Sequence, residues 1–295
     1  MQYAPYVGRF APSPTGPLHA GSLVAAMASY LDARVHHGQW LVRIEDVDEG
    51  RSAAAAAASF LALLPRLGMP WDGDVVWQSK RPQFYQAAAD SIAAHTYPCG
   101  CNRREIADSR LGTGPDGAAI YPGTCRHGLA PGRTMRSLRV RVPEAGDNTI
   151  VFTDRFAGRV AQSLAAKAGD FVLKRGDGYW AYQLAVVVDD ADQGVTDIVR
   201  GADLLDSTPR QIYLQRLLGV PTPRYLHVPV MRNAQGEKLS KQTGAAAIDP
   251  ADDAQALQLL LQAAGFLQLD VGAAATLHAF WERAVPAWHA LLAGR

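Results

Sequence analysis

The chain has 295 residues, of which 48% are hydrophobic and 19% are charged, and its formal net charge is +1. These totals predict a globular chain of roughly two domains, or of one large domain with an insertion, and net charge gives no argument for nucleic-acid binding. The chain has neither an apolar run of roughly 18 residues nor a basic-then-apolar leader, so we expect no membrane partner and a cytoplasmic location.

Strand and helix patterns alternate in the first third of the chain. YVGRF (6–10) is typical of a short buried strand, and residues 19–35 place apolar side chains on one face of a helix. WLVRIED (40–46) predicts a second strand that ends in acids. The alanine run predicts a helix over 53–68, because alanine has the highest helix propensity, and a further helix is expected over 82–97.

Residues 98–133 are rich in Cys, Gly, Pro and Arg and contain few apolar runs. The elements expected after them are strands at 138–142 and 149–154, a hairpin turning at Arg175–Gly178 and then a buried segment within 170–191, a helix capped at Ser207 or Thr208, a strand at 225–231, and helices in the last 45 residues.

Strands that alternate with helices predict an α/β fold with a Rossmann-type parallel sheet. The segment 91–180 breaks this alternation with antiparallel-looking strands, so we interpret it as an inserted α+β subdomain. The predicted division is 1–90 for the first half of the sheet domain, 91–180 for the insertion, 181–245 for the second half, and 246–295 for a small helical region.

RFAPSPTGPLHAGS (9–22) connects the first strand to the first helix. Such a turn presents free backbone N–H groups at the positive end of the helix, which suits a phosphate. His19 would lie at that end, and Gly21 lets a nucleotide approach the backbone closely. Arg9 stands near the end of the strand, where ligands of open α/β sheets bind. The same letters are also compatible with an ordinary turn.

GEKLSKQTG (236–244) is a polar loop that follows the last predicted strand. Its Lys238 and Lys241 flank Ser240. A lysine loop can close over a triphosphate and neutralise charge in the transition state, although a loop of this composition can equally be a solvated segment.

Together the two segments resemble the HIGH and KMSKS signatures of class I aminoacyl-tRNA synthetases. RIEDVDEGR (43–51) and YQLAVVVDDADQGVTDIVRGADLLDSTPRQ (182–211) extend the resemblance, over about residues 1–245, to the glutamyl-tRNA synthetase catalytic core. The resemblance implies ATP and L-glutamate as substrates, with Mg²⁺ accompanying the ATP. It implies catalytic roles for His19, Lys238 and Lys241.

The resemblance also implies a glutamate site. Two carboxylates require cations and the ammonium requires an anion, roles that suit Arg9, Arg200 and Glu45. The implied glutamate-binding set is Arg9, Ala11, Ser13, Glu45, Tyr182 and Arg200, and the implied ATP-binding set is His19, Gly21, Ser240 and Lys241. A Mg²⁺ role for Asp46 or Asp48 is a less favoured alternative.

About 50 residues follow the lysine loop, where full glutamyl-tRNA synthetases carry a long helical anticodon-binding region. In this respect the chain resembles the glutamyl-queuosine tRNA(Asp) synthetase family, whose members activate glutamate without tRNA and transfer it to queuosine in the anticodon of tRNA(Asp). The resemblance implies a ligase with queuosine-bearing tRNA(Asp) as its partner. The alternatives are a compact glutamyl-tRNA synthetase that charges tRNA(Glu), and an inactive synthetase-like RNA-binding protein.

Cys99, Cys101 and Cys125 are the only cysteines, and an odd number argues against a disulfide framework. Three thiolates suit one structural Zn²⁺, which needs a fourth ligand. His127 is the better fourth ligand on chemical grounds, whereas the resemblance to the queuosine family implies Tyr121. The predicted zinc site is Cys99, Cys101, Tyr121 and Cys125, with three free thiols as the alternative.

The insertion also contains the densest basic run of the chain. Residues 99–145 hold eight arginines and four acids, a surplus of +4 against +1 for the whole chain. This surplus suits contacts with RNA phosphates, and an ordinary solvated face is the alternative interpretation.

Overall fold

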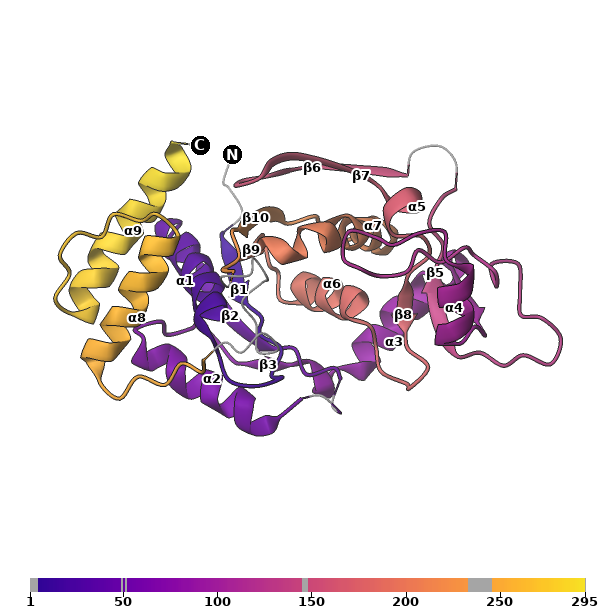
Figure 1. Ribbon diagram of the computed structural model, residues 1–295, viewed down its shortest axis with the longest axis horizontal. Helices are drawn as coiled ribbons and strands as arrows, with labels where there is room; N and C mark the ends of the chain where they lie inside the picture. The colour runs from indigo at the N-terminus through magenta and orange to yellow at the C-terminus, as the bar shows by residue number, and fades with distance from the viewer. Residues whose placement is uncertain (1–4, 49, 51, 145–147, 233–245, 295) are drawn as a thin grey trace.

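The computed structural model describes residues 5–48, 50, 52–144, 148–232 and 246–294. Parallel strands form its centre (Figure 1). The first set has the order β1-β2-β3 and consists of β1 (Val7–Phe10), β2 (Gln39–Ile44) and β3 (Val76–Trp77). The second set pairs β9 (Asp197–Gly201) in parallel with β10 (Arg224–Val228).

Strands β1 and β9 lie side by side and join the two sets. The Thr196 backbone N–H donates to the Val7 carbonyl oxygen at 2.9 Å, and the Val7 N–H donates to Thr196 Oγ1 at 2.9 Å. All four residues of β1 are buried, as is typical of parallel strands that are covered on both faces. The prediction of an α/β fold with a parallel sheet is therefore confirmed.

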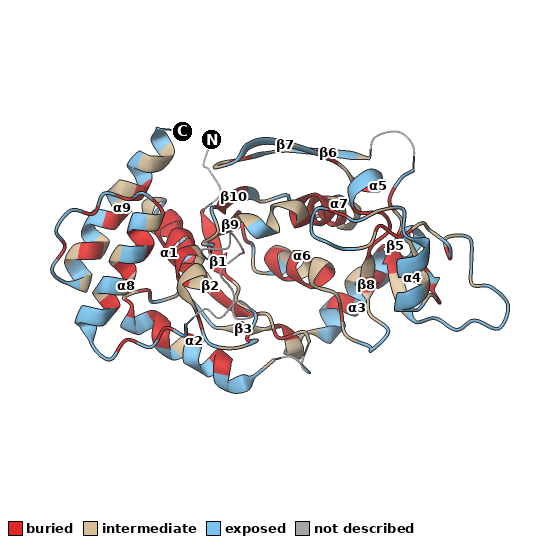
Figure 2. Ribbon diagram, in the orientation of Figure 1, coloured by how far each residue is buried: buried red, intermediate tan, exposed pale blue. Residues whose placement is uncertain are grey.

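Four helices pack around these strands, and α1 is one of the most buried of them. The helices around the strands are α1 (Ala20–Val35), α2 (Ala54–Arg66), α6 (Tyr182–Asp192) and α7 (Thr208–Leu218). Prolines at 12, 14 and 17 keep the preceding segment out of a helix, so α1 begins only after His19. Figure 2 shows α1 buried along most of its length, because it packs between the strands and two C-terminal helices.

The C-terminal helices are α8 (Asp253–Phe266) and α9 (Leu277–Ala293), and they confirm the helical periodicity predicted there. Both pack against α1 (Figure 1). The Trp288 indole Nε1 of α9 donates to the Asp32 Oδ1 of α1 at 3.0 Å. Among the described helices, none combines the length and apolar character needed to cross a membrane.

The segment between the two strand sets forms a second, antiparallel sheet. Its order is β4-β5-β8, formed by β4 (Thr96–Cys99), β5 (Ser137–Val140) and β8 (Val172–Lys174). A hairpin of β6 (Thr149–Asp154) and β7 (Gly158–Ser163) also belongs to this segment, and the short helix α5 (Leu164–Lys167) follows it. Strand β6 pairs in parallel with β10 where Asp154 lies opposite Tyr225, so the hairpin extends the central sheet.

One expectation about this segment was wrong, and one helix was missed. The helix predicted over 82–97 ends early: α3 spans Pro82–Ser91, a 3₁₀ turn spans Ala93–His95, and β4 follows. Tyr97 and Cys99 are buried and Pro98 is exposed, which is the two-residue period of a strand. Within 98–133, where no helix was predicted, the structure has helix α4 (Arg103–Ser109), which starts with a capping box between Asn102 and Glu105.

Candidate active site

A cavity of about 570 Å³ opens at the carboxyl ends of β1, β2, β9 and β10. The predicted residues that line it are Arg9, Ala11, Ser13, His19, Gly21, Glu45, Tyr182 and Arg200. The structure thus brings together the whole predicted glutamate set and two members of the nucleotide set. Lys238, Ser240 and Lys241 lie outside the described residues.

Arg9 enters the cavity from β1 and is held from behind by Asp190 of α6. Arg9 Nε donates to Asp190 Oδ1 at 3.0 Å and Nη2 donates to Oδ2 at 3.4 Å. Arg43 Nη2 approaches the same Oδ1 at 2.8 Å. Burial raises the pKa of Asp190, but the charges of Arg43 and Arg9 outweigh it and hold the pKa below its ordinary value. Asp190 is therefore charged and fixes the Arg9 guanidinium.

Sequence reasoning missed both Asp190 and Arg43. A signal for Asp190 exists in VVVDDADQG, where acids interrupt an apolar run, because a buried acid requires a charged partner. The partner could not be inferred, since Arg9 and Asp190 are 181 positions apart.

Glu45 follows β2 and supplies the anionic side of the cavity. Arg43 Nη2 donates to Glu45 Oε1 at 3.3 Å, and the Glu45 side chain is only 7% exposed. Burial raises the pKa of Glu45 above its ordinary value in spite of the nearby Arg43 and Arg9. A ligand ammonium at this point would therefore meet a poorly solvated carboxyl group, which favours ion pairing.

Arg200 enters the cavity from β9, on the far side of the sheet centre from Glu45. Its guanidinium donates to Tyr182 Oη at 3.3 Å, to Thr208 Oγ1 at 2.8 Å and to His227 Nε2 at 3.0 Å. Burial raises the pKa of Tyr182, so its hydroxyl stays neutral. Two guanidiniums and one carboxylate in a single cavity match an amino acid with two carboxylates and one ammonium.

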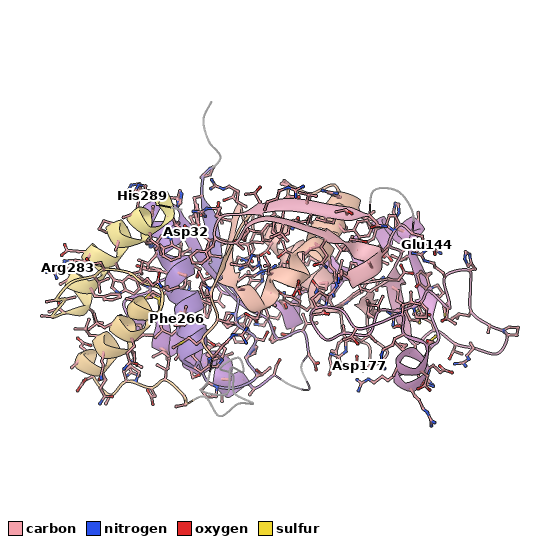
Figure 3. All side chains as sticks on the ribbon, turned by 45° about the horizontal axis from the view of Figure 1, so that its top comes forward. Asp32, Glu144, Asp177, Phe266, Arg283 and His289 are labelled. Atoms are coloured by element: carbon pink, nitrogen blue, oxygen red, sulfur yellow. The ribbon has the colours of Figure 1, made fainter. Side chains whose placement is uncertain are left out.

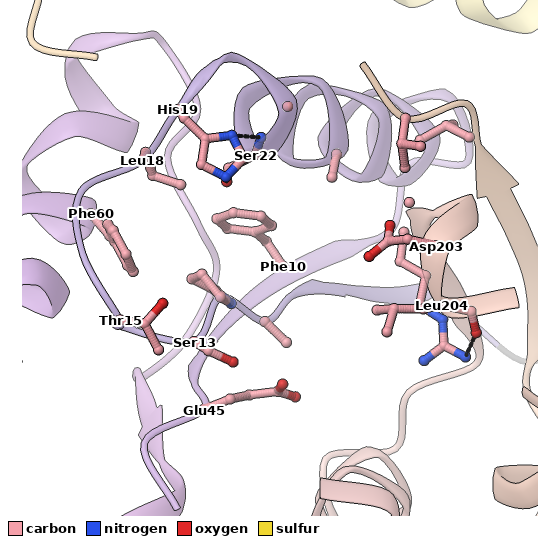
Figure 4. A pocket seen from close by; sticks show the side chains of 18 of the residues that line it. Phe10, Ser13, Thr15, Leu18, His19, Ser22, Glu45, Phe60, Asp203 and Leu204 are labelled. Carbon is pink, nitrogen blue, oxygen red and sulfur yellow. Dashed lines mark hydrogen bonds between the residues drawn. The ribbon is translucent and has the colours of Figure 1, made fainter. Parts of the chain in front are cut away.

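His19 caps the N-terminus of α1 at the other side of the cavity. Its Nδ1 accepts from the Ser22 backbone N–H at 3.3 Å, and its Nε2 lies 3.2 Å from Ser22 Oγ. Figure 4 shows His19 and Ser22 at one side, Glu45 at the other, and Phe10 between them. His19, Gly21 and Ser22 line the cavity, so the N-terminus of this 16-residue helix faces it, and the first turn contains no acid that would offset its positive end. This is a favourable place for a phosphate.

The acids considered for Mg²⁺ are engaged elsewhere. Asp46 accepts from the Ser79 backbone N–H at 2.8 Å and from Ser79 Oγ at 2.7 Å. Asp48 pairs with Arg175 at 2.5 Å. These contacts fix both carboxylates in structural bonds, so the alternative of a Mg²⁺ site on Asp46 or Asp48 gains no support.

The three cysteines meet below the antiparallel sheet, around the Tyr121 hydroxyl. Their sulfur atoms all lie within 4.8 Å of one another, with Cys101 and Cys125 3.6 Å apart. Tyr121 Oη lies 3.4 Å from both Cys99 Sγ and Cys101 Sγ. Two thiolates on a tetrahedral Zn²⁺ are about 3.8 Å apart, so the donors fit this ion. His127 is not a member of the metal-ligand group found among the described residues.

The surroundings favour a thiolate at Cys99 but not at Cys101. Burial and the hydrogen bond with Cys125 raise the pKa of Cys101 to about 11. Burial raises the pKa of Cys99, but hydrogen bonds from Tyr121 and from the Cys101 backbone lower it to about 7. The Arg139 guanidinium stacks over the Tyr121 ring, 4.0 Å from its centroid. A cation at this position offsets the negative charge that three thiolates carry.

Half of the predicted arginine run has a structural role. Arg126 pairs with Asp170 at 2.7 Å, Arg133 pairs with Glu105 at 2.5 Å, Arg139 is buried, and Arg141 Nη1 donates to the Thr96 carbonyl at 2.6 Å. The exposed members are Arg103, Arg104, Arg110, Arg133 and Arg136, of which Arg133 is the one already paired with Glu105. The face available to an anionic partner is therefore smaller than the sequence suggested and centres on α4.

The fold and the cavity define the catalytic domain of a class I synthetase. Residues 6–264 match the family described as tRNA synthetases class I (E and Q), catalytic domain. The chain is also similar to the crystal structure of a glutamate-tRNA synthetase from Elizabethkingia anophelis, with a TM-score of 0.70 and 25% identity. That match covers 82% of this chain and 53% of the other, so the chain spans about half the length of that protein.

Comparison with curated relatives shows which members of this family the chain is highly similar to. The chain is 63% identical over 285 residues to the glutamyl-Q tRNA(Asp) synthetase of Janthinobacterium sp. (strain Marseille), covering 96% of both chains. It is 62% identical over 290 residues to the protein of the same name from Verminephrobacter eiseniae (strain EF01-2), covering 98% of both. The chain therefore belongs to the glutamyl-Q tRNA(Asp) synthetase family of ligases, as its resemblance predicted.

Proposed function

We propose that this chain activates L-glutamate with ATP, without tRNA, and transfers the glutamyl group to queuosine in the anticodon of tRNA(Asp). The observation that carries the proposal is the cavity that combines Arg9, Arg200 and Glu45 at the carboxyl edge of the sheet. Relatives that are 62–63% identical over nearly their whole length support the choice of acceptor. A cytoplasmic location and the four-part division at 90, 180 and 245 belong to the same proposal.

In the first step the α-carboxylate of glutamate attacks the α-phosphorus of ATP, forming glutamyl-adenylate and releasing pyrophosphate. Arg9 and Arg200 bind the carboxylates, and Glu45 binds the ammonium. Asp190 keeps Arg9 in place, so less conformational entropy is lost when the ligand binds. These residues orient the nucleophile and take no proton from it, because a carboxylate is already deprotonated at neutral pH.

The nucleotide binds at the N-terminus of α1. His19 and the backbone around Gly21 contact the α-phosphate, and the helix dipole stabilises the charge that develops there. The proposal assigns Ser240 to ATP binding and assigns Lys238 and Lys241 to charge neutralisation in the transition state, all three being outside the described residues. A Mg²⁺ ion that accompanies the ATP would supply further charge compensation.

In the second step a hydroxyl of the queuosine cyclopentene-diol attacks the activated carbonyl, an ester forms, and AMP leaves. Four exposed arginines of the insertion, Arg103, Arg104, Arg110 and Arg136, contact RNA phosphates. Their position on and beside α4 keeps them away from the glutamate cavity, so they contribute to RNA affinity and leave glutamate activation unaffected.

A structural Zn²⁺ held by Cys99, Cys101, Tyr121 and Cys125 is part of the proposal. The close approach of three sulfurs and one phenol oxygen supports it. Bound there, the ion would crosslink β4 to the loop that contains Tyr121 and Cys125, and so stabilise the base of α4.

Two assays test the proposed function. Glutamate-dependent exchange between ATP and pyrophosphate without RNA should occur, and labelled glutamate should transfer to tRNA(Asp) that carries queuosine. Charging of the 3′ end of tRNA(Glu) would instead support a compact glutamyl-tRNA synthetase. Absence of exchange with glutamate would support an inactive RNA-binding protein, and either result would overturn the proposal.

A further inference from the structure

The orientation of Arg200 in the cavity depends on a neighbour that does not line the cavity. Arg200 is 5% exposed, and its Nε donates to His227 Nε2 at 3.0 Å. Strands β9 and β10 place Arg200 and His227 in direct register. With Nε bound on one side and the terminal nitrogens bound to Thr208 and Tyr182, the plane of the guanidinium is fixed.

The contact with Arg200 defines the protonation state of His227. An arginine Nε is always a donor, so His227 Nε2 must be the acceptor and the ring proton must reside on Nδ1. His227 Nδ1 lies 2.7 Å from Asp154 Oδ2, and both side chains are completely buried. His227 therefore donates to Asp154 and accepts from Arg200. Thr208 Oγ1, which accepts from Arg200 Nη2, also lies 3.2 Å from His227 Nε2. Burial also lowers the pKa of His227, which favours this neutral form.

Asp154 is itself fixed by the backbone. Its Oδ1 accepts from the N–H groups of Phe156 at 2.9 Å, Ala157 at 2.7 Å and His227 at 3.2 Å. These three donors hold the carboxylate so that only Oδ2 faces the imidazole. Asp154 is the last residue of β6, so a residue of the inserted segment sets the hydrogen bonding of a residue in the central sheet.

We propose that Asp154 and His227 are positioning residues for amino-acid recognition, in which Asp154 fixes the tautomer of His227 and His227 orients Arg200 towards the bound amino acid. The described lining of the cavity includes neither residue, so the effect passes through Arg200. The inference rests on the proposed function only in naming glutamate as the amino acid.

The variant Asp154→Asn distinguishes control of the His227 tautomer from support of the turn at Phe156 and Ala157. The three backbone donors at Oδ1 require an oxygen there, so the asparagine amide group must place its NH₂ against His227 Nδ1. His227 Nδ1 must then accept a hydrogen bond from the asparagine, so the ring proton moves to Nε2. There the new N–H group faces the Arg200 Nε–H. Arg200 loses its acceptor although the shape of the side chain is unchanged.

His227 variants test the same link from the other side. His227→Gln keeps an acceptor near the position of Nε2 and is the conservative variant. His227→Leu removes the acceptor, and adding Asp154→Asn to it should raise the KM for glutamate no further, because Asp154 acts on Arg200 through His227. Asp32→Asn is a matched control, since Asp32 is another buried acid but lies in α1, 13 residues beyond His19.

Glutamate-dependent ATP–pyrophosphate exchange without RNA measures the effect. We expect Asp154→Asn and His227→Leu to raise the KM for glutamate roughly tenfold, as for the loss of one hydrogen bond to a charged group, with kcat and the KM for ATP within about twofold of wild type. His227→Gln and Asp32→Asn should keep the wild-type KM for glutamate. An unchanged KM in Asp154→Asn, or equal changes in both KM values, would overturn the inference. Lack of exchange in the wild type would overturn only the proposed function.

A second measurement needs no substrate. In protein labelled with ¹⁵N-histidine, the ring nitrogens of His227 should show the Nδ1–H tautomer at pH 7, assigned by the signals lost in His227→Gln. Asp154→Asn should convert it to the Nε2–H tautomer. A wild-type His227 that is protonated on Nε2 would refute the inference whatever the enzyme activates.

Discussion

Asp32 connects three parts of the chain, and its replacement should lower stability without changing catalysis. Figure 3 shows Asp32 on α1 beside the C-terminal helices. Its carboxylate accepts from Tyr6 Oη at 2.6 Å, from Arg155 Nη1 at 2.6 Å and Nη2 at 2.9 Å, and from Trp288 Nε1 at 3.0 Å. Its side chain is completely buried.

The expected size of the effect follows from these contacts. Asp32→Asn keeps the shape, removes the charge and turns an NH₂ group towards donors. Breaking a buried ion pair from one side costs about 3–5 kcal/mol, and Arg155 is 24% exposed, so water can partly solvate it. We therefore expect a loss of about 3 kcal/mol in the free energy of unfolding, which for a chain of this length is a fall in Tm of about 5 °C.

Thermal unfolding followed by circular dichroism at pH 7 measures this loss, with Tyr6→Phe as a milder comparison. Tyr6→Phe removes one donor and leaves Asp32 charged, so it should cost about 1 kcal/mol. Burial raises the pKa of Asp32, but the hydrogen bonds and charge of Arg155 outweigh it and lower the pKa. The Asp32 contribution is thus present above the unfolded pKa of about 4 and lost as the pH falls further. A loss in Asp32→Asn no larger than that in Tyr6→Phe would refute the reasoning.

Three other predictions concern the site and the insertion. Cys101→Ser should lower the zinc content below one ion per chain in metal analysis and lower the Tm, with ATP–pyrophosphate exchange measured at 25 °C largely retained. Glu45→Gln should raise the KM for glutamate at least tenfold, and the wild-type affinity for glutamate should fall with decreasing pH already above pH 4.5, because the pKa of Glu45 is raised. The triple change of Arg103, Arg110 and Arg136 to Ala should weaken tRNA(Asp) binding, measured by filter binding. The slope of log binding constant against log salt concentration should fall in magnitude by about one per lost phosphate contact. ATP–pyrophosphate exchange without RNA should be unchanged.

The residues at strand ends were the predictable part of the site. Arg9 and Glu45 each stand within a predicted strand, and the carboxyl ends of parallel strands meet at one edge. Arg200 lies in β9, a strand that was not predicted, so only the family resemblance indicated it. His19 could be placed because prolines fix where α1 can begin. These signals are local, and so a single sequence contains them.

The acids behind the site were not predictable. Asp154, Asp189 and Asp190 are buried, and each pairs with a residue far away in the sequence. Which arginine or histidine a buried acid meets depends on the tertiary fold, which local periodicity does not encode. The missed helix α4 is different, because its capping residues Asn102 and Glu105 are visible in the sequence at the expected spacing.

The pairing of β6 with β10 limits how this protein could be recombined with its relatives. A chimera that exchanges residues 99–144 would swap the cysteine-containing lobe and keep Asp154 beside His227. An exchange that continues to the end of β7 would also replace β6, so β10 would pair with a strand from the relative. A crossover before Thr149 therefore preserves the pairing of β6 with β10. The sequence alone suggests a later end of the insertion, near residue 180.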